Sequence, residues 1–258
     1  MNGRSGGLGV VRLGPYPAKR AFDVLAVLLA APVWVPLLGV VALLVRARLG
    51  APVLFRQQRP GAGGRLFELR KFRTMTDARD PDGRLLPDAV RLTPFGRWLR
   101  GTSLDELPEL LNVLRGEMSL VGPRPLLPAY LPLYSERHRL RHAVPPGITG
   151  LAQVSGRNAL TWPDRFDLDV QYAETNTLAG DLALLWRTAR AVVRREGISA
   201  VGDATMYAFT GYEPAGAEAT NTDATGTDAT SAEATGCEPA RRRTPLPALA
   251  PRASARPR

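Results

Sequence analysis

The longest apolar stretch of the chain covers residues 24–45, 22 positions without a charged side chain. A helix of that length can cross a bilayer, and no convincing cleavage site of a secretory signal follows it. Lys19 and Arg20 precede the stretch and several arginines follow it, so a simple span would place one basic flank outside, against the positive-inside tendency. Pro32 and Pro36 lie near its middle, where each removes a helical hydrogen bond. The pattern favours a re-entrant helix, which enters the membrane, breaks at the prolines and returns, over a kinked signal anchor.

A β-hairpin is predicted next, because residues 52–59 and 65–73 are strand-like and flank the glycine-rich segment 60–64. The glycines do not have the spacing of a dinucleotide-binding fingerprint. Lys71 and Arg73 would project from the second strand, either into solvent or into a phosphate site.

The clearest amphipathic helix is predicted over residues 181–195, and a shorter helix over 93–100. Arginines cover the polar side of the longer helix. Tryptophan beside arginine is typical of a helix in the lipid headgroup region, although a helix packed on a core would show the same stripe. The predicted apolar stripe consists of Leu182, Leu185, Trp186, Ala189, Val192 and Val193.

The composition changes abruptly after Gly211. An acidic residue followed by Ala-Thr recurs every five residues from 218 to 235, and this tract has no core-forming side chains.

Together, the patterns along the chain predict a mostly helical α+β protein with a small β-hairpin and interfacial amphipathic helices. The expected divisions are a flexible N-terminus (1–18), the re-entrant membrane helix (19–48), a folded domain (49–212) and a disordered low-complexity tail (213–258).

The net charge of +10 and the pI of about 10.7 predict an anionic partner: nucleic acid, anionic lipid or a phosphorylated substrate. Most of the basic residues are arginines, whose planar fork suits phosphate. The single cysteine, Cys237, excludes an internal disulfide framework and fits a reducing compartment.

Two adjacent carboxylates, Asp105 and Glu106, stand between Arg100 and Arg124 along the chain. With Asp105 as a helix N-cap, Pro108 falls in the first turn, where its missing N–H costs least. One interpretation is that the acidic pair only caps this helix. The other is that the helix N-terminus and the arginines hold phosphate, with Asp105 as a nucleophile and Glu106 as a ligand of Mg²⁺.

Further polar residues are candidates for substrate contacts. Gln153 and Arg157 lie in loop-like segments. Asp167 and Asp169 have the D-x-D spacing by which some nucleotide-sugar enzymes hold a divalent metal. An acidic first turn of a helix would give the same spacing, so this signal is weak.

Taken together, a series of ordered motifs resembles the bacterial sugar transferase family, the monotopic polyprenyl-phosphate phosphoglycosyl transferases. The resemblance extends to about Gly211 and points to the small, minimal form of the family. The motifs are Lys19-Arg-Ala-Phe-Asp23, Lys71-Phe-Arg-Thr-Met75, Thr102-Ser-Leu-Asp-Glu-Leu-Pro108, Asn112-Val-Leu-Arg-Gly116, Met118-Ser-Leu-Val-Gly-Pro-Arg-Pro125, Arg141-His142, Pro146-Gly-Ile-Thr-Gly150, Gly156-Arg-Asn158 and Gly202-Asp-Ala-Thr-Met206.

The resemblance implies a catalytic phosphoglycosyl transferase domain on the cytoplasmic face of the bacterial inner membrane. The protein would be monotopic, held in membrane lipid by the re-entrant helix. Its substrates would be a UDP-sugar and polyprenyl (undecaprenyl) phosphate, with Mg²⁺ as cofactor. Nucleic acid is not expected as a partner, and homo-oligomerisation is left open. One departure is Ala31, where some relatives have serine before the proline.

The resemblance also assigns roles to residues. Asp105 matches the nucleophile, and Glu106 matches its Mg²⁺-associated partner. Arg100 and Arg124 match positions associated with phosphate binding. The remaining matched positions are Lys71, Pro123, Gln153 and Arg157 for phosphate or nucleotide-sugar binding, and Asp169 as a second metal ligand.

In the implied reaction, Asp105 attacks the sugar-linked phosphate of the UDP-sugar and releases UMP. Polyprenyl phosphate then takes the phosphosugar, which initiates synthesis of a surface polysaccharide or glycoconjugate. Three alternatives stay open: direct transfer with Asp105 as a base, a D-x-D-type glycosyltransferase that releases UDP, and a non-catalytic membrane scaffold. The sequence does not identify the sugar.

Overall fold

The computed structural model describes residues 13–156, 160–194 and 208–212, all of which belong to one compact unit spanning residues 1–213. The tail predicted over 213–258 lies outside the described residues, and so does Arg157. Predictions on these parts of the chain therefore stay predictions.

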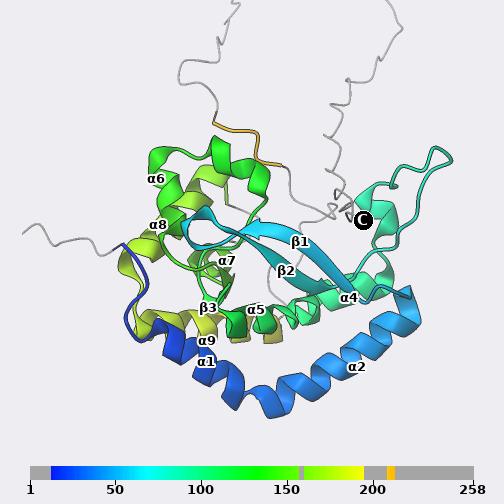
Figure 1. The fold of residues 1–258 in the computed structure, drawn as a ribbon, viewed down its shortest axis with the longest axis horizontal. Helices are drawn as coiled ribbons and strands as arrows, with labels where there is room; N and C mark the ends of the chain where they lie inside the picture. Colours follow the sequence, from blue (N-terminus) through cyan, green and yellow to red (C-terminus); the bar gives the residue numbers. More distant parts are fainter. Residues whose placement is uncertain (1–12, 157–159, 195–207, 213–258) are drawn as a thin grey trace, which may run out of the picture. The chain divides into compact units, whose positions relative to one another are not determined.

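Helices make up most of the described chain, and the sheets are small (Figure 1), as expected for the predicted fold class. The helices are α1 (Lys19–Leu29), α2 (Ala31–Leu49), α3 (Asp88–Arg91), α4 (Pro94–Gly101), α5 (Glu109–Arg115), α6 (Glu136–Arg139), α7 (Leu151–Ser155), α8 (Trp162–Thr175) and α9 (Leu178–Arg194). Short 3₁₀ turns cover Ala62–Gly64, Leu104–Glu106, Pro128–Leu133 and Leu140–Ala143. The strands are β1 (Leu54–Pro60), β2 (Leu66–Phe72), β3 (Ser119–Val121) and β4 (Gly147–Thr149).

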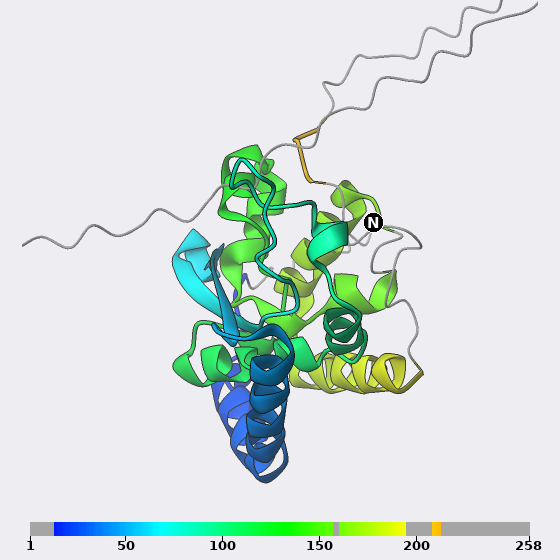
Figure 2. The ribbon, with the colours of Figure 1, turned by 90° about the vertical axis from the view of Figure 1, so that its right-hand side faces the viewer.

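The long apolar stretch forms two helices, α1 and α2, which meet at Ala30. The break predicted near the prolines is confirmed: Pro32 lies in the first turn of α2, where its missing N–H costs no helical hydrogen bond. Pro36 lies inside α2 without ending it. The indole of Trp34 donates to the carbonyl of Val27 at 2.9 Å and ties the two helices together across the bend. The bend lies along the lower edge in Figure 1 and projects from the rest of the unit in Figure 2.

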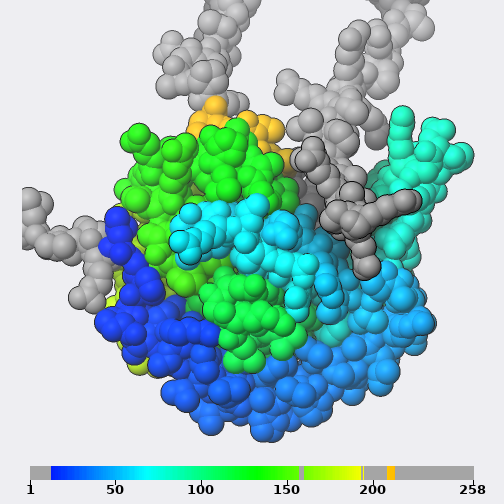
Figure 3. Space-filling view, in the orientation of Figure 1, coloured from blue at the N-terminus to red at the C-terminus, as the bar shows by residue number. Residues whose placement is uncertain are grey.

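The two sides of this helix pair differ in their contacts. On the inner side, Val27 and Trp34 pack with β2 and α5, and Val41 and Val45 pack with α4. In the space-filling view, α1 and α2 form the lower edge of the unit (Figure 3). Of the described helices, α2 is the one long and apolar enough to cross a membrane. The exposed large apolar residues of the pair are Leu25, Leu28, Leu29, Val33, Val35, Val40, Leu43 and Leu44.

The predicted β-hairpin is confirmed as the antiparallel pair β1–β2. Phe55 is opposite Lys71 and Arg59 is opposite Phe67. Because side chains alternate between faces and directly opposite residues share one, Lys71 lies on the same face as Phe67 and Leu69. That face is the inner one, because Phe67 and Leu69 are buried against α5.

The parallel pair β3–β4 brings two glycines into close backbone contact. A Cβ added to Gly147 would lie 2.0 Å from the backbone nitrogen of Gly122. A side chain at either position would therefore separate the two strands. This close approach explains the glycines of the Val-Gly-Pro-Arg and Pro-Gly-Ile-Thr segments, and it fixes the backbone from which Arg124 projects.

Helix α9 confirms the long amphipathic helix, but its predicted apolar stripe packs on the core only in part: Leu185 does, whereas Leu182 and Trp186 do not. Trp186 is 70% exposed and Leu182 is 52% exposed. The packed face instead carries Asp181 and Leu184, which are both buried. Of the two environments that the stripe could serve, the structure therefore excludes core packing for Leu182 and Trp186.

Candidate active site

Five elements bring one ionic cluster together. Lys71 comes from β2, Glu106 from the 3₁₀ turn Leu104–Glu106, Glu109 from the first turn of α5, and Arg124 from the segment after β3. The Lys71 ammonium lies 2.8 Å from Glu106 Oε1 and 2.9 Å from Glu109 Oε1. The Arg124 guanidinium lies 2.7 Å from the same Oε1 of Glu106. Arg100, on α4, is close enough for its charge to lower the pKa of Asp105. The sequence motifs that carry these residues are far apart, so the fold assembles the cluster.

Asp105 does not cap α5, which corrects the prediction from the helix-start pattern. It lies inside the 3₁₀ turn Leu104–Glu106, and α5 begins only after Pro108. Ser103 precedes the turn in a left-handed conformation with φ of 56°. Leu107 has helical dihedrals, with φ of −51° and ψ of −39°, but Pro108 has no N–H to donate to the Leu104 carbonyl, so the 3₁₀ turn stays separate from α5. The acidic pair is therefore presented by a turn and is not consumed in helix capping.

The Asp105 carboxylate has a distinctive environment. Its side chain is 9% exposed, yet within the described part of the chain it makes neither a hydrogen bond nor an ion pair. Its pKa is raised to about 6, because burial and, to a smaller extent, the negative charge of Glu106 outweigh the opposite effects of Lys71, Arg100 and Arg124. At neutral pH the carboxyl group is therefore mostly ionised. None of the described residues pairs with it, so its oxygens are available for attack on a substrate.

Glu106 has the opposite environment. Burial alone would raise its pKa, but the charges of Lys71 and Arg124 and the hydrogen bonds from both hold that pKa well below its usual range. Glu106 is therefore a fixed anion. Glu109 is buried and lies next to this anion, and the pKa of its carboxyl is raised to about 7 by burial and by the charge of Glu106, against the effect of Lys71.

Arg100 is oriented by a residue that the sequence did not single out. Its Nε donates to the hydroxyl of Thr74 at 3.1 Å, and Thr74 is buried at the end of β2. Gly96 makes this approach possible, because a Cβ there would lie 1.9 Å from the Thr74 carbonyl oxygen. Arg73, which lies between the end of β2 and Thr74, donates to the carbonyl of Leu49 at the end of α2. The phosphate-binding candidate Arg100 is thus held against the segment that ties down the apolar helix.

Arg124 is held by its backbone as well as its side chain. The Arg141 guanidinium donates to the Arg124 carbonyl at 2.7 Å and forms a buried ion pair with Asp169 at 2.7 Å. Pro123 is buried beside it, and its carbonyl accepts from the Gly147 N–H at 3.0 Å. The metal role predicted for Asp169 stays a prediction, and its pairing with Arg141 gives that role no support.

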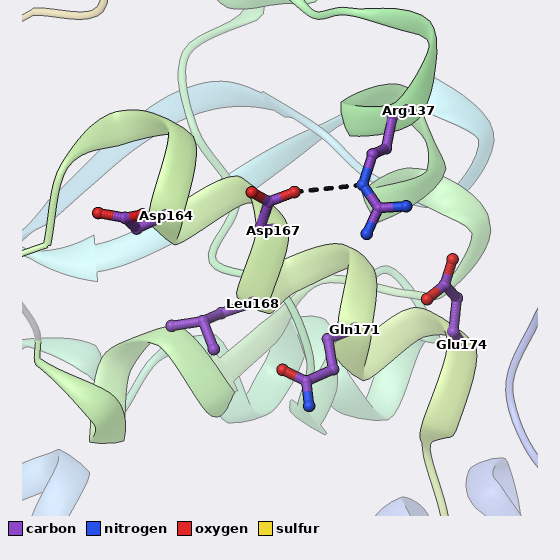
Figure 4. Close-up of a pocket in the computed structure, with 6 residues that line it drawn as sticks. All are labelled: Arg137, Asp164, Asp167, Leu168, Gln171 and Glu174. Atoms are coloured by element: carbon purple, nitrogen blue, oxygen red, sulfur yellow. Dashed lines mark hydrogen bonds and ion pairs between the residues drawn. The ribbon is translucent and has the colours of Figure 1, made fainter.

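Three other residues that the sequence singled out, Gln153, Asp167 and Asp169, lie on the helices α7 and α8. Gln153 is in α7, which packs against α8 and α9, and not in the loop predicted from the sequence. Asp167 lies on α8, where it accepts from Arg137 at 3.2 Å and from His138 at 3.1 Å, at the side of an open surface depression of about 440 Å³ (Figure 4). Asp169 is buried on the other side of the helix. Residues two apart on a helix do not face each other, so the Asp167–Asp169 pair does not form a chelating site.

The sequence missed two residues of the cluster, Glu109 and Thr74. Glu109 is three positions after Glu106, a spacing that would have placed both on one side of a continuous helix. Thr74 lies within the Lys71–Met75 motif, and only the packing of α4 on β2 shows that it contacts Arg100.

The carboxylates of the cluster are the candidate ligands for Mg²⁺. The described residues contain no group of three metal-ligating side chains. Magnesium sites commonly use one or two carboxylates and complete their shell with water and substrate phosphates. Glu106 fits such a site, because Oε1 takes both cations while no hydrogen bond within the described residues occupies Oε2. Asp105 beside it is also an unengaged oxygen donor.

Proteins of known family that resemble this chain in sequence are sugar transferases. The sequence model described as bacterial sugar transferase matches residues 15–195. An uncharacterised sugar transferase, EpsL of Bacillus subtilis, is 53% identical over 75% of this chain and 96% of its own length. The exopolysaccharide production protein ExoY of Rhizobium meliloti is 39% identical over 73% of this chain and 91% of its own. The UDP-glucose:undecaprenyl-phosphate glucose-1-phosphate transferase of Caulobacter vibrioides is 42% identical over 68% of this chain and 72% of its own.

Proposed function

The chain belongs to the bacterial sugar transferase family, and from this premise we propose that it transfers a sugar-1-phosphate from a UDP-sugar to a polyprenyl phosphate in the membrane. The observation that carries the proposal is the contrast between two neighbours: Asp105 is buried and has no ionic partner among the described residues, whereas two cations hold Glu106. The relative from Caulobacter vibrioides is named for a reaction of this class.

In the first step, an Asp105 carboxylate oxygen attacks the phosphorus that carries the sugar. The bond from this phosphorus to the bridging oxygen breaks, UMP leaves, and the phosphosugar remains on Asp105 as an acyl phosphate. Arg100 and Arg124 stabilise the charge on the phosphoryl oxygens as it is redistributed. In the second step, a phosphate oxygen of polyprenyl phosphate attacks the same phosphorus, takes the phosphosugar and restores the Asp105 carboxylate.

Glu106 is the residue that would hold Mg²⁺, through its Oε2. When bound, the ion would supply charge neutralisation at the diphosphate of the donor. Lys71 keeps Glu106 ionised and oriented whether or not the ion is present, because its ammonium lies 2.8 Å away. Glu109 also forms an ion pair with Lys71, the cation whose charge lowers the pKa of Asp105.

We further propose that α1 and α2 form a re-entrant hairpin that enters the membrane from the cytoplasmic face. Two observations support it. The bend at Ala30 is surrounded by exposed apolar side chains such as Leu29, which is 81% exposed, and Val33, which is 73% exposed. The two outer ends of the pair return to the folded unit: Lys19 pairs with the buried Asp181 of α9 at 2.5 Å, and Arg73 donates to the Leu49 carbonyl. The exposed Trp186 of α9 would lie in the headgroup region.

The experiment that tests the function is UMP release from a panel of UDP-sugars, with purified full-length protein, Mg²⁺ and undecaprenyl phosphate. We expect release of UMP from at least one donor, dependent on lipid acceptor under multiple-turnover conditions. Release of UDP would indicate a glycosyltransferase instead. No nucleotide release from any donor, by a protein that still binds membranes, would support a scaffold.

A further inference from the structure

Arg59, at the end of β1, is a half-buried cation without a carboxylate partner among the described residues. Its Nη2 donates to the neutral amide oxygen of Gln57 at 2.6 Å. Its Nε is fully buried and finds no acceptor in that part of the chain. No carboxylate of the described residues lies within ion-pair distance of it, whereas Arg73, Arg124 and Arg141 each pair with an acid. A guanidinium removed from water needs compensating acceptors, and the described residues supply Arg59 with only one.

The register of the hairpin places Arg59 on the side of the active site. Arg59 is opposite the buried Phe67, and Lys71 lies on the same inner face. The outer face offers a comparison. Arg56 lies there, and its guanidinium is 3.6 Å from Glu68. On the outer face of the hairpin Arg56 is paired with an acid, whereas on the inner face Arg59 has no acidic partner among the described residues.

A second guanidinium, that of Arg124, acts electrostatically on Arg59. The pKa of Arg59 is lowered to about 10, first by burial and then by the charge of Arg124, while Glu109 acts in the opposite direction. Glu109 is not a free counter-ion for Arg59, because its Oε1 lies 2.9 Å from Lys71. Two guanidinium groups within each other's field, one of them without an acid, form a local excess of positive charge. Such an excess is favourable only when an anion binds.

We propose that Arg59 and Arg124 form a subsite for a second phosphate group, distinct from the phosphate that Asp105 attacks. This inference rests on the proposed function and deepens it, since both substrates of that reaction carry such a group. One source is the nucleotide phosphate of the donor, which leaves as UMP. The other is the terminal phosphate of the lipid acceptor. Both are phosphate oxygens that a guanidinium can bind through two parallel hydrogen bonds.

The test uses full-length protein in detergent micelles and three variants. Arg59→Gln removes the charge, Arg59→Lys keeps a charge but loses the fork, and Arg56→Gln is the matched control on the outer face of the same strand. Equilibrium binding is measured with UMP and with inorganic phosphate, and the Michaelis constants are measured separately for UDP-sugar and for undecaprenyl phosphate.

The two sources give different results. If the subsite takes the donor's nucleotide phosphate, Arg59→Gln weakens UMP binding and raises the Michaelis constant for UDP-sugar at least about tenfold, and that for undecaprenyl phosphate stays within about twofold. If it takes the acceptor's phosphate, the two effects are reversed, and UMP release without acceptor is unchanged. In both cases Arg59→Lys recovers part of the loss and Arg56→Gln behaves as wild type.

Two results would overturn the inference. One is that Arg59→Gln matches Arg56→Gln, within about twofold, in every binding and Michaelis constant. The other is that Arg59→Lys and Arg59→Gln lose activity equally and both melt below wild type, which would show a structural role. Wild-type protein that releases no UMP would refute the proposed function instead, and phosphate binding by the Arg59 variants would still decide on the subsite.

Discussion

Asp105 and Glu106 are neighbours in one 3₁₀ turn, yet of the cations in the described part of the chain two pair with Glu106 and none pairs with Asp105. The consequence is a separation of their pKa values in opposite directions: that of Asp105 is raised to about 6, and that of Glu106 lies far below its usual range. Neighbouring carboxyl groups with separated pKa values have different chemical roles. Here Glu106 is a permanent anion for cations, and Asp105 is the carboxylate left available for the substrate.

Acid should stop the first half-reaction through Asp105. As the pH falls through about 6, the carboxylate becomes protonated and loses its nucleophilicity. We expect UMP release without acceptor, measured by rapid quench at saturating donor, to fall about tenfold between pH 7 and pH 5. Glu109→Gln is the control, because the pKa of Glu109 is also raised, to about 7. A rate that is flat between pH 5 and pH 7.5, or a limb that disappears in Glu109→Gln, would contradict the assignment.

Removing the charge of Asp105 should stabilise the fold at neutral pH. Its pKa in the folded protein, about 6, is above the ordinary aspartate value of 3.8. The folded state therefore favours the protonated form, and the stability cost of the ionised form grows as the pH rises from 3.8 and is complete above about 6. Asp105→Asn should raise the free energy of unfolding by on the order of 2 kcal/mol at pH 7.5.

The pH dependence distinguishes this effect from a general change in packing. Below pH 4 both the folded and unfolded chains carry a protonated Asp105, so the advantage of Asp105→Asn should disappear. The measurement is the melting temperature of both proteins at pH 7.5 and at the lowest pH at which they remain folded. An Asp105→Asn protein that melts below wild type at pH 7.5 would refute the prediction.

Asp169 should act through Arg141 on Arg124 and not through a metal. Asp169→Asn breaks a buried ion pair, for which losses of roughly 3–5 kcal/mol in stability are typical, and it loosens the hold of Arg141 on the Arg124 carbonyl. We expect a lower melting temperature and lower turnover, with the Mg²⁺ concentration for half-maximal activity unchanged. Arg141→Gln should reproduce these effects. A large increase in the Mg²⁺ requirement of Asp169→Asn alone would restore the metal-ligand role.

Both ends of the apolar helix pair should lie on the cytoplasmic side. The test places single cysteines at two exposed positions, Leu13 before α1 and Ala62 in the hairpin turn, in a chain whose Cys237 is replaced by serine. Neither cysteine should react with a membrane-impermeant thiol reagent in intact cells, and both should react after lysis. Labelling of Leu13→Cys alone from outside would show a true membrane span.

Local patterns in the sequence were sufficient for several of the elements but not for β4 and α7, which lie in a segment predicted to be a loop. The glycine-rich turn predicts β1–β2, the prolines predict the break between α1 and α2, and the helical spacing of apolar residues predicts α9. The orientation of α9 was not predictable, because its apolar stripe fits both a core and a lipid surface. Only tertiary contacts decide that Leu184 packs inward and Trp186 does not.

The candidate site shows the same limit. The order of the motifs identified Asp105, Glu106, Arg100 and Arg124, but no periodicity indicates that Lys71 bridges Glu106 and Glu109. That contact depends on how the inner face of the hairpin packs on α5. Similarly, the helix-start pattern around Asp105 predicted a cap, because it could not show that Pro108 would separate a 3₁₀ turn from α5.

The central claim is that Asp105 is a covalent nucleophile. The most direct measurement is incubation of wild type, Asp105→Asn and Glu106→Gln with Mg²⁺ and a UDP-sugar labelled in the sugar, without acceptor, followed by acid quench and peptide analysis. We expect stoichiometric label on the wild-type peptide that contains residue 105, none on Asp105→Asn, and reduced label on Glu106→Gln that increases at high Mg²⁺. Label at residue 105 of the Asp105→Asn protein, or near-normal turnover by that protein, would contradict the mechanism.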